Sequence, residues 1–307
     1  MYDLNVVWPS QEYTAPTPAQ LENLYNTISM LHSFGYNYLA INFIVPESVK
    51  LPQSKAQALN PIPMADLRHR FRGFPKLRLF SRITLVLSDP AKCQSVLKIN
   101  NTGAFDIVAV QPMTEKSLQL TTANLDIDLI SLPMATRWPF FLKHKTVGQA
   151  LSKGIKFELC YSGLIGGPAG YQSASALGVT GKISRKQFLS NSLQLIRASR
   201  SQGLVLSSGA AEPMNVRNHV DILAIFSQLD LRTSNCKEGF MKNPEAVLIK
   251  GRLRITSNKQ TVMLGGHSAD GETRGSIMLE GEASNALKSY KRKREDGEEN
   301  AKKQNLQ

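Results

Sequence analysis

The chain has 307 residues, of which 42% are hydrophobic, and a formal net charge of +13 at pH 7. A chain of this size and composition can bury a full hydrophobic core, and an α/β barrel commonly uses such a length as one domain. Its three cysteines are widely spaced and form no Cys-x-x-Cys pair, which excludes a disulfide framework and a zinc ribbon. We expect no secretory signal, and no apolar run reaches the length of a membrane-spanning helix.

The positive charge is concentrated in the first 255 residues. These contain 28 lysines and arginines against 16 acidic residues, whereas residues 256–307 contain nine against eight. A basic folded body favours a polyanionic partner, most simply a nucleic acid, over a surface that is basic only for solubility.

Seven segments are predicted to be strands. Most are short runs rich in Ile, Val and Leu, and near-continuous apolar runs are typical of strands that are buried on both faces of a parallel sheet. The expected strands are residues 2–8, 38–45, 78–87, 105–110, 125–132, 155–161 and 203–207.

Helical patterns alternate with these strands. The first helix is expected to begin at a Thr17 cap, with Pro18 in its first turn, and to end at Gly35. The other expected helices are residues 90–99, 139–152, 184–200, 213–229 and 244–250. Strands that alternate with helices predict a TIM-barrel-like (β/α) barrel of about seven strands or a related α/β layer fold.

Two segments depart from this alternation. Residues 162–182 contain six glycines together with Ala and Ser, which predicts a flexible insertion. From residue 256 the apolar periodicity stops, so we expect a barrel domain over 1–255 and a disordered tail over 256–307. One basic cluster in this tail is interpreted as a nuclear localisation signal rather than as a solvated charge run. It consists of Lys291, Arg292, Lys293 and Arg294.

The polar ends of the strands are where an α/β barrel would place a catalytic site. Asp126 and Asp128 stand two apart on one expected strand face, and Asp106 or Glu158 could join them in a metal-dependent phosphoesterase. The chain has only five histidines and lacks the His-x-His spacing that would place two ligands on one strand face. We therefore favour the simpler interpretation, in which the two aspartates accept hydrogen bonds from backbone or arginine donors. No catalytic residue, metal site or cofactor is expected.

Basic residues gather in groups that contain no acid. Such a density of Arg and Lys suits contacts with phosphates, and without an aromatic-rich β-platform we expect no base-specific recognition. The RNA-binding candidates are Arg68, Arg70, Arg72, Arg82, Lys143, His144, Lys145, Arg197, Arg200, Lys250, Arg252 and Arg254. Separately, the turn at 207–210 could bind a phosphate or could simply require Gly209.

Eight segments, in order, resemble one protein family. They are D-L-N-V at 3–6, L-H-S-F-G-Y-N-Y-L-A-I-N-F at 31–43, L-F-S-R-I-T-L-V-L-S-D-P at 79–90, F-D-I-V-A-V-Q-P at 105–112, N-L-D-I-D-L-I at 124–130, F-L-K-H-K at 141–145, R-A-S-R-S-Q-G-L-V-L-S-S-G-A at 197–210 and K-G-R-L-R at 250–254. Together they resemble the thirty-kilodalton protein subunit of eukaryotic and archaeal ribonuclease P, shared in eukaryotes with ribonuclease MRP, and its fungal members above all. The tail does not share this resemblance, and the loop at 162–182 departs from the family pattern.

The resemblance implies a TIM-barrel-like fold related to the PHP metal hydrolases, with Asp3-Leu4-Asn5 where those enzymes carry His-x-His. It also implies a subunit that is not an enzyme on its own. Such a subunit stabilises a catalytic RNA, which removes the 5′ leader of precursor tRNA with RNA-held metal ions, and it takes part in ribosomal RNA processing.

The resemblance also implies partners and a location. The partners are ribonuclease P RNA, ribonuclease MRP RNA, a small ferredoxin-like protein subunit, the other protein subunits and, indirectly, precursor tRNA, with no membrane. The location is the nucleus, and within it the nucleolus. Two hypotheses compete: the phosphoesterase described above, and a barrel that docks proteins without touching RNA.

Overall fold

The computed structural model describes residues 1–10, 13–49, 51–52, 59–89, 96, 99–100, 102–165 and 184–256. All of them belong to one compact unit, Met1–Val262, and a second unit, Met263–Gln307, lies outside them. The predictions for the disordered tail and its basic cluster therefore fall outside the described residues, as do most of the helix expected at 90–99 and most of the loop at 162–182.

Seven parallel strands follow one another across a single sheet in chain order. They are β1 (Tyr2–Val7), β2 (Tyr38–Val45), β3 (Arg78–Leu87), β4 (Ile107–Pro112), β5 (Leu129–Ser131), β6 (Lys156–Cys160) and β7 (Leu204–Ser207). A parallel bridge joins Val6 to Ala210 just after β7, and Val7 N donates to Ala210 O at 3.1 Å. The sheet thus forms a nearly closed barrel, and the prediction of a TIM-barrel-like fold with about seven strands is confirmed.

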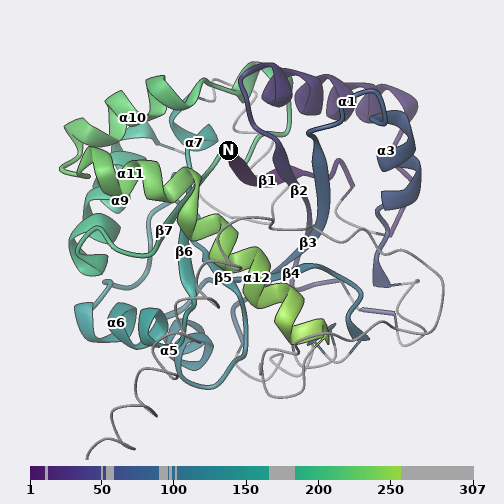
Figure 1. Cartoon of the computed structure of the whole chain (residues 1–307). Coiled ribbons are helices and arrows are strands. Elements are labelled where there is room, and N and C mark those ends of the chain that lie inside the picture. The colour runs from purple at the N-terminus through teal and green to yellow at the C-terminus, as the bar shows by residue number, and fades with distance from the viewer. Residues whose placement is uncertain are drawn as a thin grey trace, which may run out of the picture. The chain divides into compact units, whose positions relative to one another are not determined.

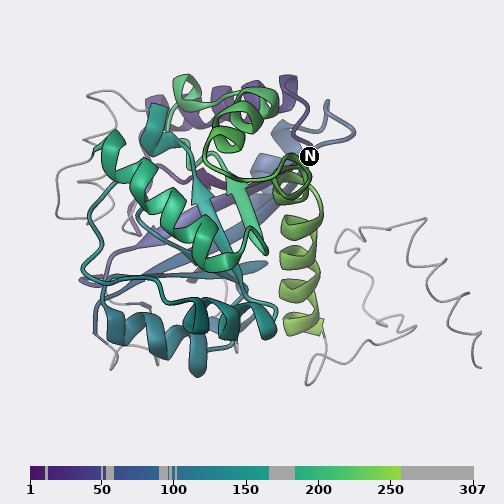
Figure 2. The ribbon, with the colours of Figure 1, turned by 90° about the vertical axis from the view of Figure 1, so that its left-hand side faces the viewer.

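Helices surround this barrel (Figures 1 and 2). They are α1 (Pro18–Ser33), α3 (Met64–Arg70), α5 (Glu115–Ala123), α6 (His144–Ser152), α7 (Ser162–Ile165), α9 (Arg185–Ser199), the 3₁₀ turn η2 (Pro213–Asn215), α10 (His219–Gln228), α11 (Thr233–Phe240) and α12 (Lys242–Thr256). The predicted cap of α1 is confirmed, because Thr17 Oγ1 accepts from Gln20 N while Gln20 Oε1 accepts from Thr17 N. Among the described residues, no helix has the length and apolar character needed to span a membrane.

Several expected element boundaries are wrong. The helix expected at 139–152 begins only at His144, since Phe140 and Leu142 are buried while Phe141 and Lys143 are exposed, an alternation typical of extended chain. The helix expected at 213–229 is divided into η2 and α10, and the one at 244–250 is the middle of the longer α12. The sequence patterns did not predict α5 or α11, and the strand expected at 125–132 contains only the three residues of β5.

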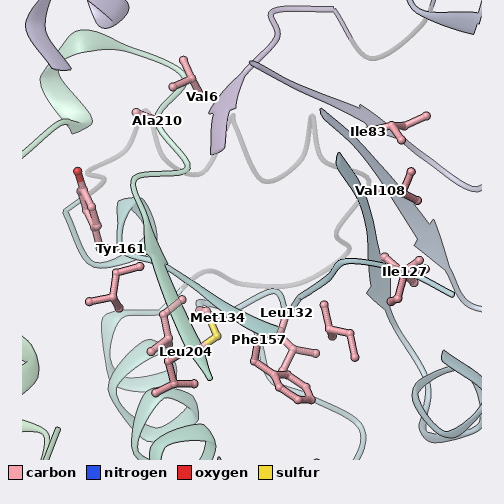
Figure 3. Packing of buried hydrophobic residues seen from close by; sticks show 14 of the residues in the cluster. Val6, Ile83, Val108, Ile127, Leu132, Met134, Phe157, Tyr161, Leu204 and Ala210 are labelled. Atoms are coloured by element: carbon pink, nitrogen blue, oxygen red, sulfur yellow. The ribbon is translucent and has the colours of Figure 1, made fainter. Parts of the chain in front are cut away.

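The two faces of the strands differ in character. The outer face packs against the helices through a large apolar cluster, and in Figure 3 the labelled side chains of Ile83, Val108 and Phe157 lie on the outer side of the ring of strands. The intervening positions, which face the barrel interior, include buried Asn42, Arg82 and Glu158. Burial on both faces is therefore confirmed for these strands, but the interior face carries polar side chains.

Candidate RNA-binding surface and barrel interior

An ion pair crosses the barrel interior. The Arg82 guanidinium on β3 donates to the Glu158 carboxylate on β6, with Nη1–Oε1 at 2.5 Å and Nη2–Oε2 at 2.7 Å. Both side chains are fully buried, and β4 and β5 separate their strands in the sheet. Arg82 also donates to Leu4 O and Thr84 Oγ1, so every guanidinium nitrogen has an internal partner. Arg82 is therefore removed from the RNA-binding candidates, because no part of it reaches the surface.

Amide and hydroxyl side chains extend this ion pair into a network. Thr84 Oγ1 donates to Asn42 Oδ1 at 2.7 Å, Asn42 Nδ2 donates to Asn5 Oδ1 at 2.7 Å, and Asn5 Nδ2 donates to Glu158 Oε2 at 3.2 Å. Burial by itself would raise the pKa of Glu158, but the adjacent guanidinium outweighs it and holds that pKa below its usual value. The network therefore ties the strands together around an ionised carboxylate.

A second buried carboxylate, that of Asp3, lies at the seam between β1 and the end of β7. Its Oδ1 accepts from Asn5 N at 3.0 Å and from Ser208 N at 3.1 Å, and Ala210 N donates to Ser208 Oγ at 3.2 Å. Because these N–H groups already donate to acceptors within the barrel, the turn at 207–210 is better described as a tight turn than as a phosphate site. The pKa of Asp3 is raised to about 6, because burial, with a smaller contribution from Glu158, outweighs the hydrogen bonds from Ser208 and Asn5 that lower it.

The carboxylates of the phosphoesterase alternative do not form one metal-binding group, although Arg254 Nη2 contacts both Asp106 O and Asp128 Oδ2. Asp106 Oδ2 accepts from Ser81 N and Ser81 Oγ at 2.8 and 2.9 Å, while Glu158 belongs to the interior network. Asp126 and Asp128 precede β5 and do not share a strand face as expected, since Asp128 is buried and Asp126 is exposed. Within the described part of the chain, no group of three or more His, Cys, Asp and Glu side chains is arranged to hold a metal ion.

Helix α12 lies across the N-terminal ends of the later strands, and Figure 1 shows it crossing in front of them. Arg254 Nη2 donates to Asp128 Oδ2 at 2.9 Å, and Val108 N donates to the same oxygen, so the simpler interpretation of Asp128 is confirmed. Lys250 Nζ donates to Ile127 O at 2.7 Å. The Arg254 and Lys250 side chains, 5% and 14% exposed, thus attach α12 to the barrel, whereas Arg252 on the same helix is exposed.

Three candidates, Arg68, Arg70 and Arg72, are exposed on and just after α3. Arg70 lies over the Tyr25 ring, 3.9 Å from its centroid, and Arg70 Nη2 is 3.8 Å from Glu22 Oε2. Arg68 Nη2 donates to the carbonyl of Leu79 at 3.1 Å. These contacts hold the guanidinium group of Arg70 against α1 and that of Arg68 against β3, while both residues stay exposed.

Two further groups of candidates, far apart in the sequence, lie side by side. His144 Nδ1 at the start of α6 is 2.6 Å from Ala198 O at the end of α9, a contact between residues 54 apart. All the candidates around this contact are exposed. We call them the α6/α9 basic surface: Lys143, His144, Lys145, Arg197 and Arg200.

The interior network was not predicted from the sequence. Asn42 and Thr84 are polar residues within apolar strands, and together with Arg82 and Glu158 they occupy positions that alternate with apolar ones. The signal available in the sequence was a polar residue within an otherwise apolar buried strand, because such a residue indicates a polar group in the barrel interior. The partners themselves depend on the sheet order and could not be read from the sequence.

The chain matches the family model of the ribonuclease P subunit p30 over residues 1–256. It is 40% identical over 276 residues, 89% of this chain and 87% of the relative, to the ribonuclease P/MRP protein subunit RPP1 of Saccharomyces cerevisiae. It is also 27% identical over 246 residues, 78% of this chain and 84% of the relative, to the ribonuclease P protein subunit p30 of Mus musculus.

A solved structure supports the fold. One chain of the archaeal ribonuclease P complex with mature tRNA superimposes with a TM-score of 0.59, covering 88% of this chain and all of that one, at 14% sequence identity. This likeness shows the barrel fold alone, while the family rests on the match over residues 1–256 and on the identity to the yeast relative. The chain belongs to the family of the ribonuclease P subunit p30.

Proposed function

We propose that this chain is a protein subunit of the ribonuclease P and ribonuclease MRP particles, and that it stabilises their RNA for 5′-leader removal from precursor tRNA and for ribosomal RNA processing. The observation that carries this proposal is 40% identity to a ribonuclease P/MRP subunit across 89% of the chain. The basic residues exposed on α3, α6, α9 and α12 agree with an RNA partner. A tagged copy expressed in its own cells should recover both RNAs when the bound RNA is sequenced, and their absence would overturn the proposal.

The second part of the proposal is that the chain does not cleave RNA by itself. The buried carboxylates Glu158 and Asp128 are engaged by Arg82 and Arg254, and Asp106 accepts from Ser81, so these groups are committed to internal partners. The purified full-length chain should leave precursor tRNA intact in Mg²⁺ and should hydrolyse no model phosphate ester. Stoichiometric zinc or manganese together with hydrolysis would revive the phosphoesterase.

The proposed RNA contacts are the candidates that remain exposed. They are Arg68, Arg70, Arg72, Lys143, His144, Lys145, Arg197, Arg200 and Arg252. Replacing both Arg197 and Arg200 by Glu should weaken assembly with the RNA, because two phosphate contacts would become two repulsions. Arg232→Glu is a matched control, since Arg232 is exposed but lies outside the candidate groups. An unchanged particle in the double variant would remove both arginines from the proposal.

We also propose a small ferredoxin-like subunit as a direct protein partner, and the nucleolus as the location within the nucleus. Co-expression of the two chains followed by size-exclusion chromatography tests the partner. The proposed nuclear localisation signal, Lys291–Arg294, lies outside the described residues. A reporter fused to residues 285–300 should enter the nucleus, and a reporter that stays cytoplasmic would remove the signal.

A further inference from the structure

One aromatic side chain next to the α6/α9 basic surface is held out in solvent. Phe141 is 71% exposed, whereas its neighbours Phe140 and Leu142 are 8% and 2% exposed. The segment before α6 therefore alternates between buried and exposed side chains, so Phe141 and the exposed Lys143 project to the same side of an extended chain. An apolar ring and a cation thus share one outward face.

The segment that carries Phe141 is fixed by buried contacts. The Phe140 ring stacks on Trp138, with centroids 6.0 Å apart and 12° between the planes, and Trp138 Nε1 donates to Pro133 O at 2.9 Å. Asn191 of α9 donates to Met134 O at 2.8 Å and to Thr136 O at 2.7 Å. Because these contacts anchor the connection between β5 and α6 as far as Phe140, the backbone that carries Phe141 does not need to be ordered when a ligand binds, which lowers the entropy cost of binding.

The charge around Phe141 identifies the chemistry of its partner. The contact between His144 and Ala198 brings the start of α6 to the end of α9, where Arg197 and Arg200 are exposed, and Lys143 and Lys145 are the sequence neighbours of His144. Glu115 Oε1 lies 2.9 Å from Lys143 Nζ, so Lys143 is paired with an acid while the group as a whole stays positive. An exposed ring among cations suits an unpaired nucleotide, whose base stacks on the ring while the flanking phosphates contact the cations.

We infer that Phe141 is a stacking platform for an unpaired base of the RNA, with Lys143, Lys145, Arg197 and Arg200 contacting the adjacent phosphates. This inference rests on the proposed function and adds to it the form of RNA that this surface binds. Stacking accepts any base, since every base has a π-face, so the surface selects single-stranded RNA over duplex without reading its sequence.

The test measures binding of the full-length chain to a single-stranded oligouridine of about ten nucleotides, a length typical of single-strand sites, and to a duplex RNA. Phe141→Leu keeps an apolar side chain but removes the ring, and it should weaken binding of the single strand about tenfold. Duplex binding and the salt dependence should stay unchanged, because no charge is altered. Phe141→Trp should preserve the affinity. Met214→Ala is the matched control, since Met214 is 75% exposed and lies on η2.

The outcomes separate this inference from the proposed function. If Phe141→Leu binds the single strand as the parent chain does, while the double variant Arg197→Glu, Arg200→Glu loses RNA, the platform is refuted and RNA binding stands. If neither variant loses RNA, RNA binding by the α6/α9 basic surface is refuted as well. If Phe141→Leu keeps its RNA affinity but releases a protein subunit from the purified particle, Phe141 docks a protein and the inference is overturned.

Discussion

Arg82 on β3 and Glu158 on β6 face each other across the barrel, with Nη1–Oε1 at 2.5 Å and Nη2–Oε2 at 2.7 Å, although two strands separate theirs in the sheet. A contact of this kind connects opposite walls of the barrel, which neighbouring strands cannot do through their backbone hydrogen bonds. It also places charged side chains that are already paired in the barrel interior, so the exposed exterior is the surface that partners can bind.

Glu158→Gln should lower the free energy of unfolding by about 3–5 kcal/mol, because it leaves the Arg82 guanidinium buried without a counter-charge. Urea denaturation at neutral pH measures this change. Glu115→Gln is the matched control, since Glu115 pairs with Lys143 at the surface and its loss should cost at most about 1 kcal/mol. Adding Arg82→Met to Glu158→Gln should recover part of the stability. Equal effects of the two single variants would contradict the structural role of the interior pair.

Asp3 should make stability fall as the pH rises from about 4 to about 6. Its pKa is raised by burial from the ordinary 3.8 to about 6, so the folded state binds more protons than the unfolded state in this window. Ionising Asp3 therefore costs about 3 kcal/mol, and the whole cost is present above pH 6. Asp3→Asn cannot titrate, so urea denaturation should show the parent losing stability relative to this variant across the window. A difference that does not change with pH would show that the Asp3 pKa is not raised.

The sequence predicted the strands better than the positions of the site residues. The strands at 38–45 and 78–87 were predicted to the residue, because continuous apolar runs mark them clearly. Periodicity did not indicate α5, since Thr121 and Thr122 are part of its buried face. It also could not separate Arg82 from Arg68: both stand in one acid-free group, yet one is fully buried and the other is exposed. That distinction depends on Glu158, which lies 76 residues from Arg82 in the chain.

Gly251→Ala should destabilise the barrel by about 1–3 kcal/mol, the usual cost of overpacking. A Cβ at this position of α12 would overlap the carbonyl oxygen of Asp106, and a backbone atom cannot move aside as a flexible side chain can. Gly148→Ala in α6 is the control: nothing lies within 4 Å of its Cβ, so it should gain about 0.5–1 kcal/mol from helix propensity. Thermal unfolding of both variants measures the contrast, and similar shifts would mean that α12 does not approach β4 closely.

Arg254→Met should lower stability without affecting RNA binding, and Arg197→Met should do the reverse, although both arginines were candidates for RNA contact. Arg254→Met leaves the buried Asp128 carboxylate without its 2.9 Å guanidinium partner, so the free energy of unfolding should fall by about 3 kcal/mol. Because Arg254 is almost completely buried, the salt dependence of RNA binding should stay as in the parent chain. Arg197 is exposed, so Arg197→Met should change stability by at most about 0.5 kcal/mol.

The same Arg197 variant should reduce the slope of log affinity against log salt by about 0.7–0.9, the loss of one phosphate contact. Urea denaturation and salt titrations of RNA binding on both variants provide the comparison. A reduced slope in Arg254→Met, measured where that variant is folded, would mean that Arg254 is accessible to RNA in solution. An unchanged slope in Arg197→Met would remove that residue from the RNA-binding surface. We expect only Arg197→Met to change the salt dependence, because a phosphate can reach only a cation that is accessible to solvent.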